Sequence, residues 1–157
     1  MPYICVLNIC ANINFGSEKM KRVLTYGTFD VFHYGHLWYL KKAKSMGDYL
    51  IVGISSDEFN EEKKGKKPYF QYEIRKEIID SIKYVDETFE QKSFEQKKDD
   101  ILKYKIDILV SSAEWKGKFD YLREYCEVIY LDRDIPYSST KIKTLLKKEE
   151  ITVLDDC

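Results

Sequence analysis

The chain has 157 residues, of which 44% are hydrophobic, enough for one domain with a sizeable buried core. Its 26 basic and 27 acidic residues give a net charge of -1, which argues against nucleic acid as a partner held through net charge. No apolar run approaches the roughly 20 residues that span a bilayer, so membrane insertion is not expected.

The cysteines and the N-terminus favour a cytoplasmic location. The chain has four cysteines and no CxxC pair, so neither a zinc site nor a disulfide framework is expected: Cys5, Cys10, Cys126 and Cys157. The apolar opening MPYICVLNIC lacks a preceding basic segment and a small-residue cleavage site, which makes it a poor signal peptide.

Residues 1–19 do not fit the pattern that follows them. They carry two of the four cysteines and three asparagines, and Met20-Lys21-Arg22 then leads straight into an apolar strand. We favour an extension outside the core, with Met20 as the natural start; an added strand or arm covering a sheet edge or a partner is the alternative. The expected division is an extension over 1–19, one domain over 20–150 and a C-terminal tail over 151–157.

Five short apolar runs after Met20 predict β-strands. Branched residues dominate them, as in strands buried on both faces. The runs are Arg22–Tyr26, Tyr49–Ile54, Val85–Phe89, Asp107–Val110 and Val128–Leu131.

Helical spacing of apolar residues separates these runs. The stripes are Leu37/Leu40/Ala43, Ile74/Ile78 or Ile79/Ile82, the looser Phe94/Ile101/Leu102, a short Tyr121/Leu122 and a last Ile142/Leu145/Leu146. Strands that alternate with helices imply βαβ units. The expected fold is α/β: a Rossmann-like five-stranded parallel sheet flanked by helices, in a single domain.

The stretch TYGTFDVFHYGH falls where such a sheet binds ligands, between the end of the first strand and a helix that begins near Tyr34–His36. Gly27 lets a phosphate approach the backbone closely, and the following Thr28, Phe29 and Asp30 offer amides and a carboxylate. The helix N-terminus adds oriented N–H groups and partial positive charge, which favour a phosphate.

Both histidines of the chain, His33 and His36, lie in this stretch, three residues apart. We expect them on one face of the first helical turn, where they can hydrogen-bond phosphate oxygens and stabilise charge as a bond breaks. Ordinary capping or core roles are the alternative, and the pairing at a strand-to-helix switch speaks against it.

This stretch resembles the HxGH signature of the nucleotidyltransferase superfamily, whose members join a nucleoside triphosphate to a phosphorylated substrate and release pyrophosphate. The resemblance extends from Met20 to about Lys147. Successive blocks are similar to the glycerol-3-phosphate cytidylyltransferase family: GDYLIVGISSDEFN, YEIRKEIIDSIKYVDE, FEQKKDDI, WKGKFDYL, CEVIYL and SSTKIK.

The resemblance implies a set of site residues. Those expected to act in catalysis are His33, His36, Lys64 and Lys66; the lysine loop is one residue longer than usual, which leaves Lys63 and Lys67 as alternatives. Those expected to bind the nucleotide are Tyr26, Gly27, Thr28, Phe29, Asp30, Gly35, Glu114, Trp115, Arg133, Ser138, Ser139, Thr140 and Lys141. Those expected to bind the acceptor are Arg75 and Lys97.

Each of these stretches also has a plainer interpretation. SSTKIK could be a simple helix N-cap, because hydroxyls cap free amides. EEKKGKKP, residues 61–68, could be a solvated loop. Arg75 could be a surface helix residue, although a guanidinium suits a phosphate through paired hydrogen bonds. Lys97 could be an exposed helix lysine.

Two segments depart from the family pattern. Where the family usually has GDDW, this chain has Ser112-Ala113-Glu114-Trp115, and where it has RTEGIS, this chain has Arg133 followed by DIPYS. Both segments flank the expected nucleotide and acceptor pockets, so base preference and acceptor identity are the properties they put in question.

The resemblance implies a cytidylyltransferase that transfers CMP from CTP to a small phosphorylated alcohol, with glycerol 3-phosphate as the best candidate and CDP-glycerol and pyrophosphate as products. A Mg²⁺ ion bridging the phosphates is expected, with Asp30 as a residue that helps to order it. The family also implies a homodimer formed through the segment 83–87, and a role in cell-wall or capsule polymer biosynthesis. Alternatives are a sister enzyme for choline phosphate, ethanolamine phosphate or another polyol or sugar phosphate, an adenylyltransferase, and a non-catalytic nucleotide-binding module.

Overall fold

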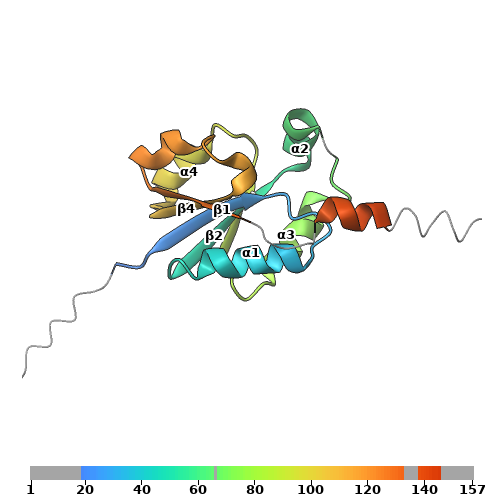
Figure 1. The fold of residues 1–157 in the computed structure, drawn as a ribbon, viewed down its shortest axis with the longest axis horizontal. Coiled ribbons are helices and arrows are strands. Elements are labelled where there is room, and N and C mark those ends of the chain that lie inside the picture. The colour runs from blue at the N-terminus through green and yellow to red at the C-terminus, as the bar shows by residue number, and fades with distance from the viewer. Residues whose placement is uncertain (1–18, 66, 133–137, 146–157) are drawn as a thin grey trace, which may run out of the picture.

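The computed structural model describes residues 19–65, 67–132 and 138–145 (Figure 1). Five strands form one parallel sheet in the order β3-β2-β1-β4-β5. This confirms the predicted α/β fold with a five-stranded parallel sheet, and each strand lies within two residues of its expected start and end. The strands are β1 (Arg22–Gly27), β2 (Tyr49–Ser55), β3 (Glu87–Gln91), β4 (Ile108–Ser112) and β5 (Glu127–Leu131).

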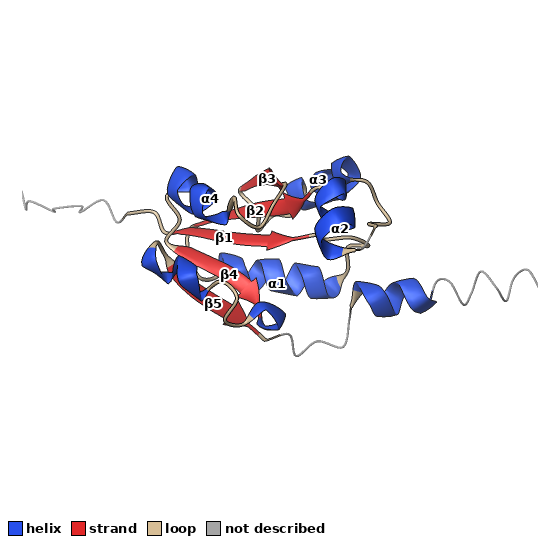
Figure 2. Ribbon diagram, turned by 90° about the horizontal axis from the view of Figure 1, so that it is seen from above, coloured by secondary structure: helices blue, strands red, loops and turns tan. Residues whose placement is uncertain are grey.

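Helices cover both faces of the sheet (Figures 1 and 2). The core on one face joins α1 and α3 to the sheet through Leu40 and Ile79, and the core on the other joins α4 and η2 through Ile101 and Leu122. A last helix covers residues 139–145. The other helices are α1 (Tyr34–Lys44), α2 (Asp57–Lys64), α3 (Tyr72–Asp80), α4 (Lys97–Tyr104) and the 3₁₀ turns η1 (Ala113–Trp115) and η2 (Asp120–Glu124).

Some expected helix faces differ from the observed ones. Ile74 is 44% exposed, whereas Arg75 beside it is fully buried. The stretch 61–68, interpreted as a possible loop, starts inside α2, which ends at Lys64 and is capped by Gly65 with a left-handed φ of 60°. The sequence pattern missed α2 because its short apolar face consists of little more than Phe59, which is 2% exposed.

The strand order reverses between β1 and β4. The chain moves from β1 through β2 to β3 on one side, then crosses to β4 and β5 on the other. In open parallel sheets a crevice forms at this point, beyond the carboxyl ends of the strands. Loops and helix starts that follow β1, β2 and β4 therefore meet at one edge, and Figure 2 shows β1 pointing toward α2 at that edge.

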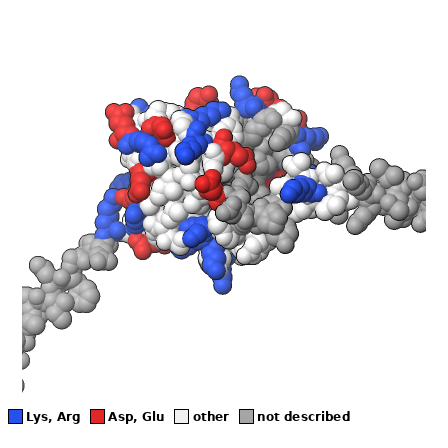
Figure 3. Space-filling view, in the orientation of Figure 1, with Lys and Arg blue, Asp and Glu red and all other residues white. Residues whose placement is uncertain are grey.

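The surface mixes charges of both signs. Figure 3 shows lysine and arginine side chains interspersed with aspartate and glutamate on the face in view. Within residues 19–65, 67–132 and 138–145, no helix combines the length and apolar character needed to cross a membrane.

Candidate active site

A cavity of about 600 Å³ opens at this switch point. Its walls come from β1 and the loop after it, α2, the start of α4, η1 and the last helix. Twelve of the residues expected at the site line it: Tyr26, Gly27, Thr28, Phe29, Asp30, His36, Lys97, Glu114, Trp115, Ser138, Ser139 and Thr140. Segments separated by more than a hundred residues in the sequence thus meet around one space.

The rings of the two histidines lie against each other in a tilted pair at the start of α1. His33 is the N-cap of α1, and His36 lies in the first turn; their ring centroids are 4.0 Å apart with an interplanar angle of 30°. Nδ1 of His33 accepts a hydrogen bond from the amide of Gly35 at 3.0 Å. The capping and catalytic interpretations of His33 are therefore compatible, because the cap uses only one ring nitrogen.

The other ring nitrogen of His33 faces the last helix. Nε2 lies 3.2 Å from Oγ of Ser139, and that hydroxyl donates to the carbonyl of Asp30 at 3.0 Å. The HYGH stretch and the SSTKIK stretch, 106 residues apart, are joined here directly. The ring of Phe29 makes an edge contact with His36, their centroids being 5.5 Å apart.

The loop after β1 adopts an unusual backbone. Phe29 and Val31 have φ values of 53° and 49°, in the left-handed region that branched residues rarely adopt. A Cβ on Gly27 would come within 2.7 Å of the Phe29 ring. Glycine at position 27 thus leaves room for the Phe29 ring; Gly27 also lines the cavity, and the approach of a phosphate to its backbone stays a prediction.

Asp30 ties this loop to two other elements. Its carboxylate accepts hydrogen bonds from the amides of Tyr69 (2.7 Å), Phe70 (3.0 Å) and Val31 (3.1 Å), and it pairs with the ammonium of Lys143. Burial alone raises the pKa of Asp30, but the hydrogen bonds from Lys143, Phe70 and Tyr69 outweigh it, and the pKa lies below its ordinary value.

The hydrogen bonds at Asp30 do not fit a metal ligand. The carboxylate oxygens offer about four acceptor positions, and four donors already occupy them. Among the described residues no three His, Cys, Asp or Glu side chains cluster as a protein-held metal site would require. The expected help of Asp30 in ordering Mg²⁺ therefore has no counterpart in this geometry.

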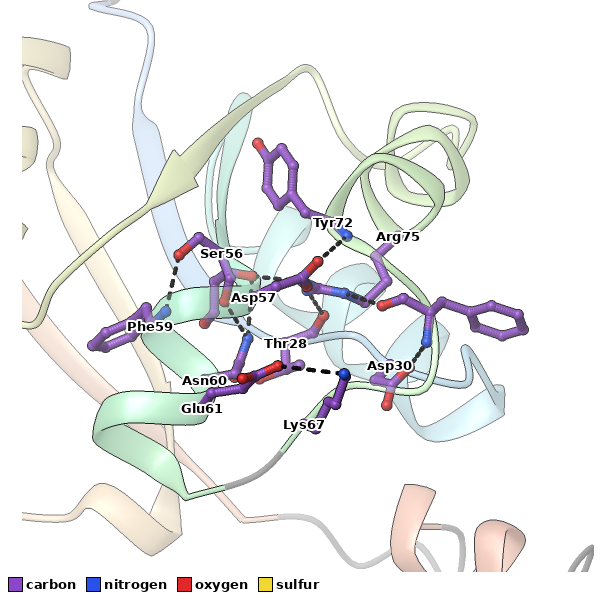
Figure 4. Close-up of polar contacts among 12 residues, drawn as sticks. Thr28, Asp30, Ser56, Asp57, Phe59, Asn60, Glu61, Lys67, Tyr72 and Arg75 are labelled. Carbon is purple, nitrogen blue, oxygen red and sulfur yellow. Dashed lines mark hydrogen bonds and ion pairs between the residues drawn. The ribbon is translucent and has the colours of Figure 1, made fainter.

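Arg75 has a different place from the expected one. The side chain is fully buried and donates to the carbonyls of Phe70 (3.0 Å), Thr28 (2.6 Å) and Ser55 (2.8 Å), and to the carboxylate of Asp57 at 2.6 Å (Figure 4). It is not among the residues that line the cavity. The guanidinium thus joins the β1 loop, the end of β2 and the start of α2, and supports the site from behind rather than facing an acceptor.

The structure describes the side chains of only two of the four candidate lysines at the end of α2, so the register stays a prediction. Lys63 and Lys67 line the cavity, and Lys67 also lies 4.0 Å from Glu61. Lys64 is the last residue of α2, and nothing is described of its side chain; Lys66 lies outside the described residues. The extra residue in this loop made the register impossible to fix from the sequence.

Lys97, the first residue of α4, is buried rather than exposed, with 2% of its surface accessible. Its ammonium lies 3.2 Å from the centroid of the Tyr26 ring. The hydroxyl of Tyr26 donates to Asp100 at 2.8 Å, and burial together with Asp100 raises the pKa of Tyr26 well above its ordinary value.

The last helix brings further groups to the cavity. Oγ of Ser138 accepts from the amide of Lys141 at 3.2 Å, so Ser138 caps this helix. Lys141 itself is exposed and is not among the cavity-lining residues, and Arg133 lies outside the described residues.

Sequence reasoning missed Lys143 and Asn60, which both line the cavity. Lys143 follows Ser139 by one helical turn, a spacing that places it on the same face and could have revealed it. Asn60 accepts a hydrogen bond from the Thr28 hydroxyl at 2.7 Å and lies in α2, the helix that the apolar pattern did not show.

The sequence is similar to several characterised proteins. Residues 24–145 match the family described as cytidylyltransferase-like. The chain is 54% identical over 124 residues to the glycerol-3-phosphate cytidylyltransferase of Bacillus subtilis (strain 168), covering 79% of this chain and 95% of the relative. It is 52% identical, over 79% of this chain and 93% of the relative, to the protein of the same name from Staphylococcus aureus (strain NCTC 8325 / PS 47).

Another relative and a solved structure are less similar in sequence. An FAD synthase of Pyrococcus horikoshii is 33% identical over 142 residues, which cover 87% of this chain and 96% of the relative. The crystal structure of the lipopolysaccharide core biosynthesis protein from Thermoplasma volcanium GSS1 superposes with a TM-score of 0.62 at 28% identity, covering 74% of this chain and 99% of that one.

Proposed function

Because the chain belongs to the cytidylyltransferase-like family, we propose that it transfers a cytidylyl group from CTP to glycerol 3-phosphate, giving CDP-glycerol and pyrophosphate. The observation that carries this proposal is the close pair His33 and His36 at the start of α1, with His36 lining a cavity that also receives lysines from α2, α4 and the last helix. Identities of 52 to 56% to three glycerol-3-phosphate cytidylyltransferases supply the substrate pair.

In the proposed reaction, an oxygen of the acceptor phosphate attacks the α-phosphorus of CTP in line with the bond to the β-phosphate. The new P–O bond forms as that bond breaks, and pyrophosphate leaves. Such transfers depend on positioning and on stabilisation of charge more than on covalent chemistry. His36, which lines the cavity, and His33 behind it stabilise the charge on the phosphorus oxygens.

The positive groups around the cavity have separate roles in this proposal. A lysine from the α2 end approaches the α-phosphate: the resemblance implies Lys64 or Lys66, and Lys63 and Lys67, which line the cavity, are the alternatives. Ser138, Ser139 and Thr140 at the start of the last helix hold the β- and γ-phosphates, because hydroxyls and amides at a helix start favour an anion. Mg²⁺ is proposed to arrive with CTP, bound by the phosphates.

The cytosine base is proposed to lie near η1. Glu114 and Trp115 both line the cavity there, within the segment that departs from the usual family sequence; Glu114 is proposed to face the base, and Trp115, whose ring centroid lies 4.5 Å from the Lys118 ammonium, to lie between the base and the acceptor. A pocket that reads a base by hydrogen bonds rejects other bases, since a mismatch leaves buried polar groups unpaired.

The proposal extends to the cellular context. The protein is inferred to act in the cytoplasm, where CTP and phosphorylated alcohols are available, and CDP-glycerol is inferred to supply a cell-wall or capsule polymer. A homodimer is inferred to form through residues 83–87. The first four of these precede β3, an edge strand of the sheet, and Glu87 is its first residue.

The test is a panel assay. Purified protein is incubated with each of the four nucleoside triphosphates and with glycerol 3-phosphate, choline phosphate, ethanolamine phosphate or a sugar phosphate, and pyrophosphate is measured. Release that requires CTP and glycerol 3-phosphate together is expected. Release with another acceptor alone would replace glycerol 3-phosphate, and no release with any pair would remove the enzymatic proposal.

A further inference from the structure

Four aromatic rings form one wall of the cavity. Tyr26, Phe94, Trp115 and Phe119 all line it. The ring centroids of Phe94 and Trp115 are 5.5 Å apart, and those of Trp115 and Phe119 are 5.8 Å apart. Clusters of this kind are the usual binding sites of quaternary ammonium groups, because the ring faces attract a cation.

In this chain, ammonium groups of the protein already cover these rings. Nζ of Lys97 lies 3.2 Å from the centroid of Tyr26 and 4.9 Å from that of Phe119. Nζ of Lys118 lies 4.5 Å from the centroid of Trp115 and 4.9 Å from that of Phe94. Each of the four rings therefore has a lysine ammonium within the distance of a cation–π contact.

The position of Lys97 is built into the fold. The Tyr26 ring lies over position 53, which is a glycine. A Cβ at that position would come within 2.4 Å of the ring. Asp100, one turn after Lys97 in α4, accepts from the Tyr26 hydroxyl at 2.8 Å and from Gln96 at 3.0 Å. Lys97 is 2% exposed, so its ammonium is held between these rings rather than ranging through solvent.

We propose that Lys97, with Lys118 at the more exposed side, selects the acceptor class by occupying the place where a cationic head group would bind. An acceptor with an ammonium group would bring a like charge against these two lysines. A phosphate monoester of an uncharged alcohol meets no such repulsion, and its negatively charged phosphate is attracted by the two lysines. This assignment rests on the proposed function and gives a reason to expect weak binding of choline phosphate and ethanolamine phosphate.

The test compares two ligands of equal shape. Choline phosphate and 3,3-dimethylbutyl phosphate differ in that a carbon atom replaces the charged nitrogen. Binding of each to the intact protein is measured by titration calorimetry in the presence of a non-hydrolysable CTP analogue, alongside glycerol 3-phosphate. The wild-type protein should bind the uncharged ligand at least about tenfold more tightly than choline phosphate, a ratio typical of one repulsive contact partly screened by solvent.

Variants separate charge from packing. Lys97→Met keeps the length of the side chain and removes the charge, and it should shift the ratio toward choline phosphate by about tenfold or more, as should Lys118→Met to a smaller extent. Lys97→Arg should keep the wild-type preference. Lys98→Met is the matched control, because Lys98 is the next residue of α4, is exposed and contacts Tyr125 away from the cavity.

Several results would overturn the assignment. Equal binding of the two matched ligands by the wild-type protein would do so without any variant, as would an unchanged ratio in both Lys97→Met and Lys118→Met. A parallel loss of affinity for the CTP analogue in Lys97→Met would place the lysine at the nucleotide instead. Since these are binding measurements, they decide the matter even if the panel assay finds no CDP-glycerol.

Discussion

Proton positions in the histidine pair follow from the hydrogen bonds of the backbone. Because Nδ1 of His33 accepts from the Gly35 amide, the proton of the neutral ring sits on Nε2, which faces Ser139. The ring can therefore donate toward an oxygen at the start of the last helix, where the leaving pyrophosphate is proposed to bind. The centroid of the His36 ring lies 4.0 Å from that of His33, and His36 lines the cavity.

Replacing His36 tests its part in the chemistry. His36→Ala should lower kcat about a hundredfold or more, with a much smaller change in CTP affinity, because its hydrogen bonding is needed most in the transition state. The measurement is steady-state pyrophosphate release together with equilibrium binding of CTP. A variant with turnover near that of the wild type would remove His36 from the mechanism.

The carboxylate of Asp30 is expected to make the difference in stability between the wild-type protein and an Asp30→Asn variant depend on pH. Its pKa in the folded protein is lowered, so the carboxylate stabilises the fold at pH values above its ordinary pKa of 3.8, and this stabilisation is lost as the pH falls below that value. Asp30→Asn should reduce the free energy of unfolding by about 1–3 kcal/mol at pH 7, where charged hydrogen bonds are lost.

The check on Asp30 is urea unfolding of both proteins at several pH values. The gap between wild type and Asp30→Asn should narrow as the pH is lowered from 5 toward 3. A gap that stays constant over this range would show that the charge of Asp30 is not what stabilises the loop.

At the scale of elements, the site depends on how the β1–α1 loop, α2 and the segment before α3 are held together. Arg75 and Asp57 join them, and the amide of Tyr72 also donates to Asp57 at 3.0 Å. Nothing local in YEIR reveals this, because three of the four acceptors of Arg75 lie 18 or more residues away along the chain. From the sequence alone, Arg75 could equally be interpreted as an exposed helix residue or as a residue that binds the acceptor.

Two neighbouring variants test this account of α3. Arg75→Leu should reduce the free energy of unfolding by about 2–4 kcal/mol, because it leaves Asp57 and three carbonyls without their donor. Lys76→Leu, which removes an exposed ion pair with Asp80, should cost less than about 1 kcal/mol. Thermal and urea unfolding measure both. Equal effects of the two changes would contradict a supporting role for Arg75.

At the scale of the whole molecule, hydrophobic periodicity was enough to predict the fold, since short apolar runs alternating with helical stripes leave a clear pattern even though β3 and β5 are only partly buried. The HYGH and SSTKIK stretches likewise indicated two sides of the cavity. The sequence could not show which lysine follows α2 into the cavity, nor that Lys97 is buried between aromatic rings, because those features depend on contacts between segments far apart in the chain.

The proposed homodimer should have twice the mass of a single chain in solution. β3 is at one edge of the sheet, and edge strands leave backbone groups available for a partner. Twofold dimers are the commonest oligomers. Multi-angle light scattering at micromolar concentration should give about twice the chain mass of 18.7 kDa. The mass of a single chain under these conditions would rule out the dimer.

The central claim is that this cavity transfers a cytidylyl group to glycerol 3-phosphate. The most direct measurement offers the protein equal concentrations of CTP and ATP with glycerol 3-phosphate and identifies the products by mass spectrometry. CDP-glycerol should account for nearly all of the conjugate formed. A mixture dominated by the adenylyl conjugate, or no conjugate at all, would contradict the claim.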